Sequence, residues 1–191
     1  MNETPDTPAL SEAALHEAAL AHLARYGATE AGLLRVLERR ILRWRRTATG
    51  DAETLDRAAA AARLAARRIV AQLAAAGGVD DAAFAHARAA RLNRSGRSRR
   101  AIAAHLAARG VAPEIAAASL PETAESELAA ALILARRRRL GPFRTVPETA
   151  PGRELAALAR AGFSRVIAEQ ALAMSPDAAL ALVLRVRRGD A

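Results

Sequence analysis

Apolar residues along this chain recur at intervals of three and four positions, the spacing that places them on one face of an α-helix. In one segment, for example, Leu33, Leu37, Ile41 and Trp44 form such a stripe. No segment shows the strict alternation of a half-buried strand. The pattern therefore predicts an all-α protein. The predicted helices cover about 11–24, 30–46, 53–76, 81–93, 98–108, 113–119, 121–139, 152–161, 164–173 and 176–187.

Residues that favour helix ends occur at the boundaries of these segments. Thr29, Asp80 and Ser98 are expected N-caps, because their side-chain oxygens can accept a free backbone N–H of the first turn. Gly110 is expected just beyond a helix end. Pro121 is expected to begin a long helix, since proline fits the first helical turn.

One segment of the sequence occurs twice. Residues 106–120 (LAARGVAPEIAAASL) match residues 158–172 (LARAGFSRVIAEQAL), so Leu106 corresponds to Leu158 and Gly110 to Gly162. Self-similarity at a fixed displacement is typical of repeat proteins, whose units contact only their neighbours. We therefore predict tandem repeats of three-helix units in an elongated stack. Leu106 and Leu158 should be equivalent buried positions.

The predicted division of the chain follows this repeat. The first repeat diverges most, because it lacks a glycine at the position of Gly110 and Gly162. The predicted parts are a disordered tail (1–10), repeat 1 (11–76, with an insertion near 47–60), repeat 2 (81–120), repeat 3 (122–173) and a C-terminal helix (175–188).

The composition indicates the cellular compartment of the protein and the kind of hydrophobic core it forms. Of 191 residues, 52% are apolar, but many of these are alanine and only 3% are aromatic, so the core should be thin and built from closely packed helices. The absence of cysteine excludes disulfides and fits a reducing cytoplasm. The polar first ten residues do not have the pattern of a signal peptide, and no apolar run is long enough to span a membrane.

No group of residues predicts catalysis, a metal site or a cofactor site. The four histidines lack the spacing of metal ligands, the glycines form no phosphate-binding motif, and Asp80 with Asp81 is better explained as helix capping. We therefore expect a protein that is not an enzyme. The histidines are His16, His22, His86 and His105.

The net charge of +9 favours an anionic partner. All 29 basic residues are arginine, but the richness in alanine and arginine indicates compositional bias, so the choice of arginine over lysine is no functional signal. Three arginine clusters are candidate binding residues. They are Arg94, Arg97, Arg99 and Arg100; Arg136, Arg137, Arg138 and Arg139; and, on the second helix, Arg35, Arg39, Arg43, Arg45 and Arg46.

The clusters differ in whether the local helix structure already accounts for the position of their arginines. Arginines 97, 99 and 100 are expected at an exposed helix start, where they oppose the helix dipole, so either an anionic partner or simple solvation accounts for them. Arginines 136–139 favour the dipole at a helix end. Four consecutive helical residues span about 300°, so one or two of these should border the core.

The hairpin over 99–120 could be mistaken for a helix-turn-helix. Its second helix, however, offers Ala112, Glu114, Ala117 and Ala118 outward, and none of these is a usual reader of base edges. The chain also has too few aromatic residues for a stacking platform. Sequence-specific DNA recognition is therefore not expected from this hairpin.

Several segments resemble the RecX family of regulatory proteins. The family's central signature has a similar counterpart here in residues 78–85 (GVDDAAFA), Arg88, Gly96 and 97–102, followed by 106–111 with Ile115 and Leu120. Residues 158–172 resemble the family's C-terminal repeat, and residues 23–25 with Thr29 and Leu33 resemble its N-terminal repeat. The resemblance covers about 13–172.

This resemblance implies an all-helical protein of tandem three-helix repeats. It implies binding to the recombinase RecA, typically along the groove of the RecA–DNA filament, with inhibition of strand exchange, ATP hydrolysis and co-protease activity. DNA would be contacted through the filament or directly, by a monomer. The alternative is a non-specific basic DNA-binding protein whose charge is its whole function.

Overall fold

The computed structural model describes residues 10–145 and 152–188, and all regular secondary structure within them is helical. This confirms the predicted all-α class. No helix in these two ranges is both long enough and apolar enough to cross a membrane. The helices are α1 (Glu12–Leu23), α2 (Glu30–Thr47), α3 (Ala52–Ala75), α4 (Asp81–Arg94), α5 (Arg99–Ala108), α6 (Pro113–Ala118), α7 (Ala124–Arg138), the short 3-10 helix η1 (Gly141–Phe143), α8 (Arg153–Arg160), α9 (Arg165–Ala173) and α10 (Pro176–Arg188).

The chain forms two compact units. Unit 1 contains the residues up to Phe84 together with Arg109–Val111, and unit 2 contains Ala85–Ala108 and the residues from Ala112 onward. Helix α4 thus begins in unit 1 and continues in unit 2, and the turn after α5 belongs to unit 1. The division into three repeats remains a prediction.

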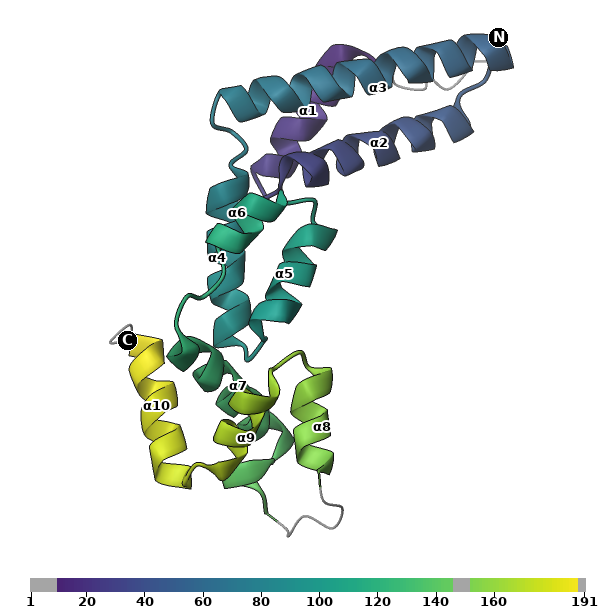
Figure 1. Ribbon diagram of the computed structural model, residues 1–191. Coiled ribbons are helices and arrows are strands. Elements are labelled where there is room, and N and C mark those ends of the chain that lie inside the picture. Colours follow the sequence, from purple (N-terminus) through teal and green to yellow (C-terminus); the bar gives the residue numbers. More distant parts are fainter. Residues whose placement is uncertain (1–9, 146–151, 189–191) are drawn as a thin grey trace. The chain divides into compact units, whose positions relative to one another are not determined.

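In unit 1, α2 and α3 lie side by side and α1 packs against both (Figure 1). The predicted apolar stripes form the core of this unit. Leu15 of α1, Leu37 of α2 and Ala66 of α3 are fully buried. Alanine supplies most of the buried face of α3, which allows its neighbours to approach closely. The other buried residues include Ala19, Leu33, Ile41, Ala59, Ala62 and Ile69.

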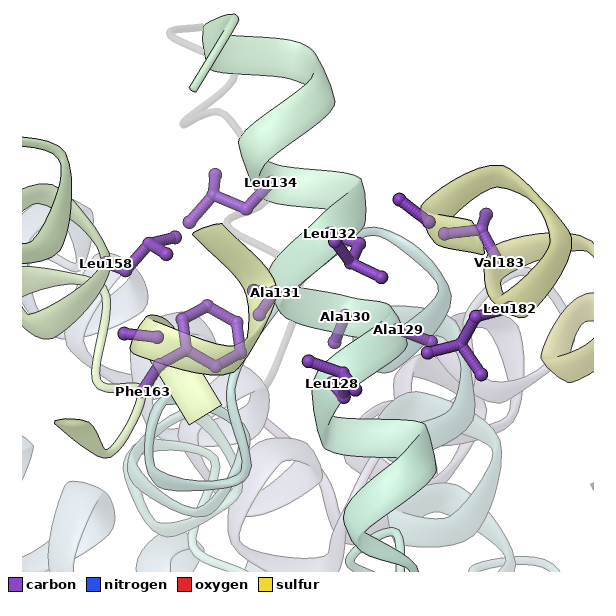
Figure 2. Close-up of a cluster of buried hydrophobic side chains, with 13 residues drawn as sticks. Leu128, Ala129, Ala130, Ala131, Leu132, Leu134, Leu158, Phe163, Leu182 and Val183 are labelled. Atoms are coloured by element: carbon purple, nitrogen blue, oxygen red, sulfur yellow. The ribbon is translucent and has the colours of Figure 1, made fainter. Parts of the chain in front are cut away.

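In unit 2, α7 is the central helix, and it packs against α9 and α10 (Figure 2). A run of alanines and Leu132 lies on the buried part of α7, while Leu158, Phe163 and Leu182 come from surrounding segments. Helix α7 buries consecutive residues, from Glu127 to Leu132, because neighbours cover it on several sides. The core is thin and rich in alanine, as the composition predicts.

The predicted caps Thr29, Asp80 and Ser98 are confirmed. Their side-chain oxygens accept the backbone N–H groups of Gly32 (2.9 Å), Ala83 (2.8 Å) and Ala101 (3.2 Å) respectively. These bonds satisfy donors that have no partner within the first turn of the helix.

The predicted start of α7 at Pro121 is wrong. The helix begins at Ala124, because the hydroxyl of Thr123 accepts the N–H of Ser126 at 3.1 Å and forms a stronger start signal than proline. A loop is predicted over 143–151, and a turn of 3-10 helix occupies Gly141–Phe143, where this loop begins. Residues 1–9 of the predicted tail and 146–151 of the predicted loop lie outside the described residues.

Candidate functional site

The two copies of the repeated segment fold into the same turn. Leu106 and Leu158 are both fully buried, which confirms their predicted equivalence. Gly110 and Gly162 follow the ends of α5 and α8, with φ values of +83° and +92°. Glycine adopts this left-handed conformation without the steric penalty that other residues incur. The sequence repeat is therefore also a repeat of backbone conformation.

Each of these glycines packs against another part of its own unit. A Cβ atom on Gly110 would lie 2.4 Å from the Cβ of Ala31, and one on Gly162 would lie 2.6 Å from the Oγ of Ser98. Both distances are far below van der Waals contact. Glycine is thus required twice over at each position, for its conformation and for its small size.

A buried hydroxyl holds each turn in place. The Oγ1 of Thr29 donates to the carbonyl of Arg109, and the Oγ of Ser98 donates to the carbonyl of Ala161, both at 2.7 Å. Thr29 is 2% exposed and Ser98 is 0% exposed. Since each hydroxyl also accepts the N–H that caps its helix, one side chain both begins a helix and fixes a distant turn.

Beside the 161–163 turn, unit 2 contains a recess of about 230 Å³, here called the arginine recess. It is built from the turn after α4, the last turns of α7 and the end of α8, which are far apart in sequence but adjacent in the fold. The recess is lined by Gly96, Arg97, Leu134, Arg137, Arg138, Arg160 and Ala161.

The arginines of this recess carry uncompensated positive charge. Within the described residues, none of the four forms an ion pair with a carboxylate, and none of the lining residues is acidic. Arg137 donates a long hydrogen bond of 3.4 Å to the carbonyl of Ser95, which carries no charge. By contrast, Arg165 on α9 pairs with Glu169 at 2.6 Å. The arginine recess therefore favours an anion.

The structure separates the members of the first predicted cluster. Arg97 lines the arginine recess, Arg100 is exposed close to the Gly162 turn, and Arg94 lines a different recess of unit 2, of about 460 Å³. Arg99 is not at an exposed position, so that prediction is wrong for this residue.

Arg99 is held in place by hydrogen bonds within the protein. Its guanidinium donates to the carbonyl of Pro121, and its backbone N–H donates to the carboxylate of Glu127 at 3.0 and 3.2 Å. Burial raises the pKa of the Glu127 carboxyl, although this N–H and the charge of Arg99 act in the opposite direction. The Glu127 carboxylate thus accepts a backbone N–H at the start of α5, and Arg99 has a structural role.

In the second cluster, all of Arg136–Arg139 are exposed, and the expectation that one or two border the core with packed stems stays a prediction. Ala135 is the last buried residue of α7, and Arg139 leaves the helix in a left-handed conformation with φ of 57°. The four arginines therefore follow the last buried residue of the helix. Only Arg137 and Arg138 of this cluster line the arginine recess.

The third cluster lies on α2 in unit 1. Arg43 and Arg46 are exposed, whereas their neighbour Arg45 pairs with Asp56 of α3 at 2.6 Å. Because they belong to the other unit, Arg43 and Arg46 are no part of the arginine recess.

Unit 1 contains a smaller basic recess, of about 160 Å³, beside the 109–111 turn. Its charged lining is Arg35, Arg39 and Arg109. Arg35 donates to the carbonyl of Arg109 at 2.8 Å, so part of its donor capacity is used within the protein. Arg109 was not among the sequence-derived candidates, and neither was Arg160 in unit 2. The available signal was their place one or two residues before the repeated glycines.

Comparison with known proteins gives two kinds of match. The sequence model described as "RecX, second three-helix domain" matches residues 80–120. Proteins named Regulatory protein RecX from Myxococcus xanthus and Agrobacterium fabrum are each 42% identical, over 167 and 103 residues. The first alignment covers 85% of this chain and 86% of that relative, and the second covers 53% and 55%. No solved structure matches significantly. This chain therefore belongs to the RecX family of regulatory proteins.

Proposed function

We propose that this protein binds the recombinase RecA and its DNA filament and inhibits its recombination, ATPase and co-protease activities. Family membership supports a regulatory role, and the resemblance described above supplies RecA as the target. The structural observation that carries the proposal is the set of exposed arginines beside the 161–163 turn, which have no carboxylate partner among the described residues. Such a surface suits the polyanionic DNA within a filament.

The proposed inhibition acts by contact. A protein bound along a filament can cover several recombinase subunits or block the growing end, so an amount below one copy per subunit should suffice. Charge contributes at long range, and the effect should therefore weaken as the salt concentration rises.

The test is the single-stranded-DNA-dependent ATPase of RecA, measured with increasing amounts of this protein. Wild-type protein should slow hydrolysis at substoichiometric amounts. The double variant Arg97→Ala and Arg100→Ala should weaken this inhibition while leaving the helical content unchanged, because both residues are exposed. Arg99 is left intact, since its bonds to Pro121 and Glu127 make it part of the fold.

A control variant should carry the same loss of charge elsewhere in unit 2. Arg91 and Arg153 are exposed and have no ion-pair partner among the described residues. Replacing both with alanine should leave inhibition close to wild type. If the Arg97–Arg100 variant inhibits as well as this control, these two residues are a solvated surface and the site assignment is wrong.

The second candidate function is non-specific DNA binding, which the net charge of +9 favours. Under that alternative, inhibition comes only from coating the DNA, and it disappears when DNA sites are in large excess. A pull-down from a native extract treated with nuclease separates the two. Recovery of RecA after nuclease treatment supports the proposal, and its loss supports the alternative.

A further inference from the structure

Two basic recesses occupy corresponding places in the two units. Each lies beside a turn that contains a repeated glycine and that a buried hydroxyl holds. Gly96 and Gly27 line the two recesses, each two residues before its capping hydroxyl, at Ser98 and Thr29. The same backbone framework thus supports a concentration of arginine twice, by segments whose sequences differ around it.

The arginine recess has the chemistry of a phosphate site. A guanidinium presents several N–H donors in a fixed plane, which match the oxygens of a phosphate. Four such groups surround a volume of about 230 Å³, smaller than the roughly 300–1,000 Å³ of pockets that enclose whole small molecules. The recess therefore suits a compact anionic group rather than an entire nucleotide.

The lining also says how such a group would be recognised. No aromatic side chain lines the arginine recess, and no Asn or Gln does, in the described part of the chain. Bases are read by stacking on aromatic rings or by hydrogen bonds to their edges. A nucleic-acid strand at this recess would consequently be held by its backbone alone.

We propose that the arginine recess binds a phosphodiester group of a nucleic-acid strand, independently of base sequence, through Arg97, Arg137, Arg138 and Arg160. This inference deepens the proposed function and rests on it, because it assigns the DNA contact of the filament to one recess and adds Arg160 to it. It also assigns a positioning role to Ser98, whose hydroxyl holds the carbonyl of Ala161 beside Arg160.

The recess in unit 1 is the weaker copy. It has three arginines instead of four and about 160 Å³ instead of about 230 Å³. Ala28 lies at the position that corresponds to Arg97, and the guanidinium of Arg35 is engaged by the carbonyl of Arg109. Fewer free donors remain for a ligand, so the contribution of this recess to strand binding should be smaller.

The test is fluorescence anisotropy with a labelled single-stranded oligonucleotide of mixed sequence, measured on the full chain without RecA at several salt concentrations. Arg138 and Arg160 are both exposed, so their double replacement by alanine should not unfold the protein. Loss of two charge-assisted contacts should weaken binding at least about tenfold at low salt. The slope of log K against log salt should also decrease by about 0.7 for each lost phosphate contact.

The control is again the double variant Arg91→Ala and Arg153→Ala, which loses the same charge. The rise in its dissociation constant should be less than about a third of the rise in the Arg138–Arg160 variant, and its slope of log K against log salt should stay close to that of the wild type. Equal losses in both variants would overturn the proposal, because net charge alone would then explain binding. A strong preference for one base sequence would overturn it as well.

Two further measurements are needed. The first distinguishes a nucleic-acid strand from a free nucleotide as the source of the phosphate, and the second distinguishes failure of this inference from failure of the proposed function. An unlabelled strand should displace the labelled one, whereas ATP at equal phosphate concentration should not; displacement by ATP would make the recess a nucleotide site instead. If the Arg138–Arg160 variant binds the strand normally but no longer inhibits the RecA ATPase, the recess contacts protein and only this inference fails. If the variant loses strand binding while wild-type protein does not slow the ATPase on saturated DNA, the inference stands and the proposed function fails.

Discussion

The 109–111 turn in unit 1 and the 161–163 turn in unit 2 share one backbone design with different surroundings. Both have a glycine at positive φ and a carbonyl that accepts a buried hydroxyl at 2.7 Å. The atoms that face the glycine differ, being the Cβ of Ala31 in unit 1 and the hydroxyl of Ser98 in unit 2. The arginines nearby also differ in number and in engagement. Packing and hydrogen bonding thus define the turn, while the charge around it varies independently.

The largest expected effect comes from adding a methyl group to either glycine. Gly110→Ala and Gly162→Ala should each lower the free energy of unfolding by about 2–5 kcal/mol, from about 1–2 kcal/mol of left-handed conformation and about 1–3 kcal/mol of overpacking. Gly110→Ala should cost at least as much as Gly162→Ala, because the Cβ of Ala31 moves only with its helix, whereas the Ser98 hydroxyl moves only by giving up its bonds to Ala161 and Ala101. Denaturant unfolding followed by circular dichroism measures both.

The chain offers a matched control for the conformational part. Gly77 has φ of +73°, yet a Cβ placed on it would meet no atom within 4 Å. Gly77→Ala should therefore cost only about 1–2 kcal/mol. If Gly110→Ala costs no more than Gly77→Ala, close packing of the turn is not what requires the glycine.

A smaller effect is expected from the buried leucines that precede the two turns. Leu106→Ala and Leu158→Ala should each lower the free energy of unfolding by about 2–4 kcal/mol, because each leaves a cavity in a fully buried position. The two costs should be similar if the repeated segments are structurally equivalent. A loss below about 1 kcal/mol at both positions would contradict their shared role in packing.

The smallest effect should come from removing the two buried hydroxyls. Thr29→Val and Ser98→Ala each delete a helix cap and leave a carbonyl without its donor, which should cost about 1–3 kcal/mol. Ser164→Ala is the control, because this serine caps α9 from an exposed site and no bond to a distant turn is lost. It should cost about 0.5–1 kcal/mol. Equal costs for Ser98→Ala and Ser164→Ala would mean that the bond to Ala161 does not stabilise the turn.

Local signals were sufficient for most helix boundaries. Thr29, Asp80 and Ser98 could be identified as caps from their type and place, since a cap bonds to residues two or three positions away. Pro121 misled because proline is compatible with a helix start without requiring one, whereas Thr123 supplies the acceptor. The second role of Thr29 and Ser98, as donors to Arg109 and Ala161, had no local signal because these partners are 80 and 63 residues away.

The arginines show the same division. Their number and net charge already pointed to an anionic partner, but their roles could not be ranked from sequence. Arg99 lies between residues proposed for binding, yet its bonds to Pro121 and Glu127 make it structural. Arg160 stood alone in the sequence, and the fold places it with Arg97 and Arg138 around one recess.

By itself, the sequence determined the helical class, the apolar stripes, most caps and the equivalence of Leu106 and Leu158. All of these depend on periodicity or on bonds between near neighbours, which a linear pattern records directly. The tertiary structure alone decided which arginines share a recess, which one is engaged by the fold, and why Gly110 and Gly162 admit no side chain. These properties depend on atoms brought together from segments tens of residues apart, and no local pattern encodes such distances.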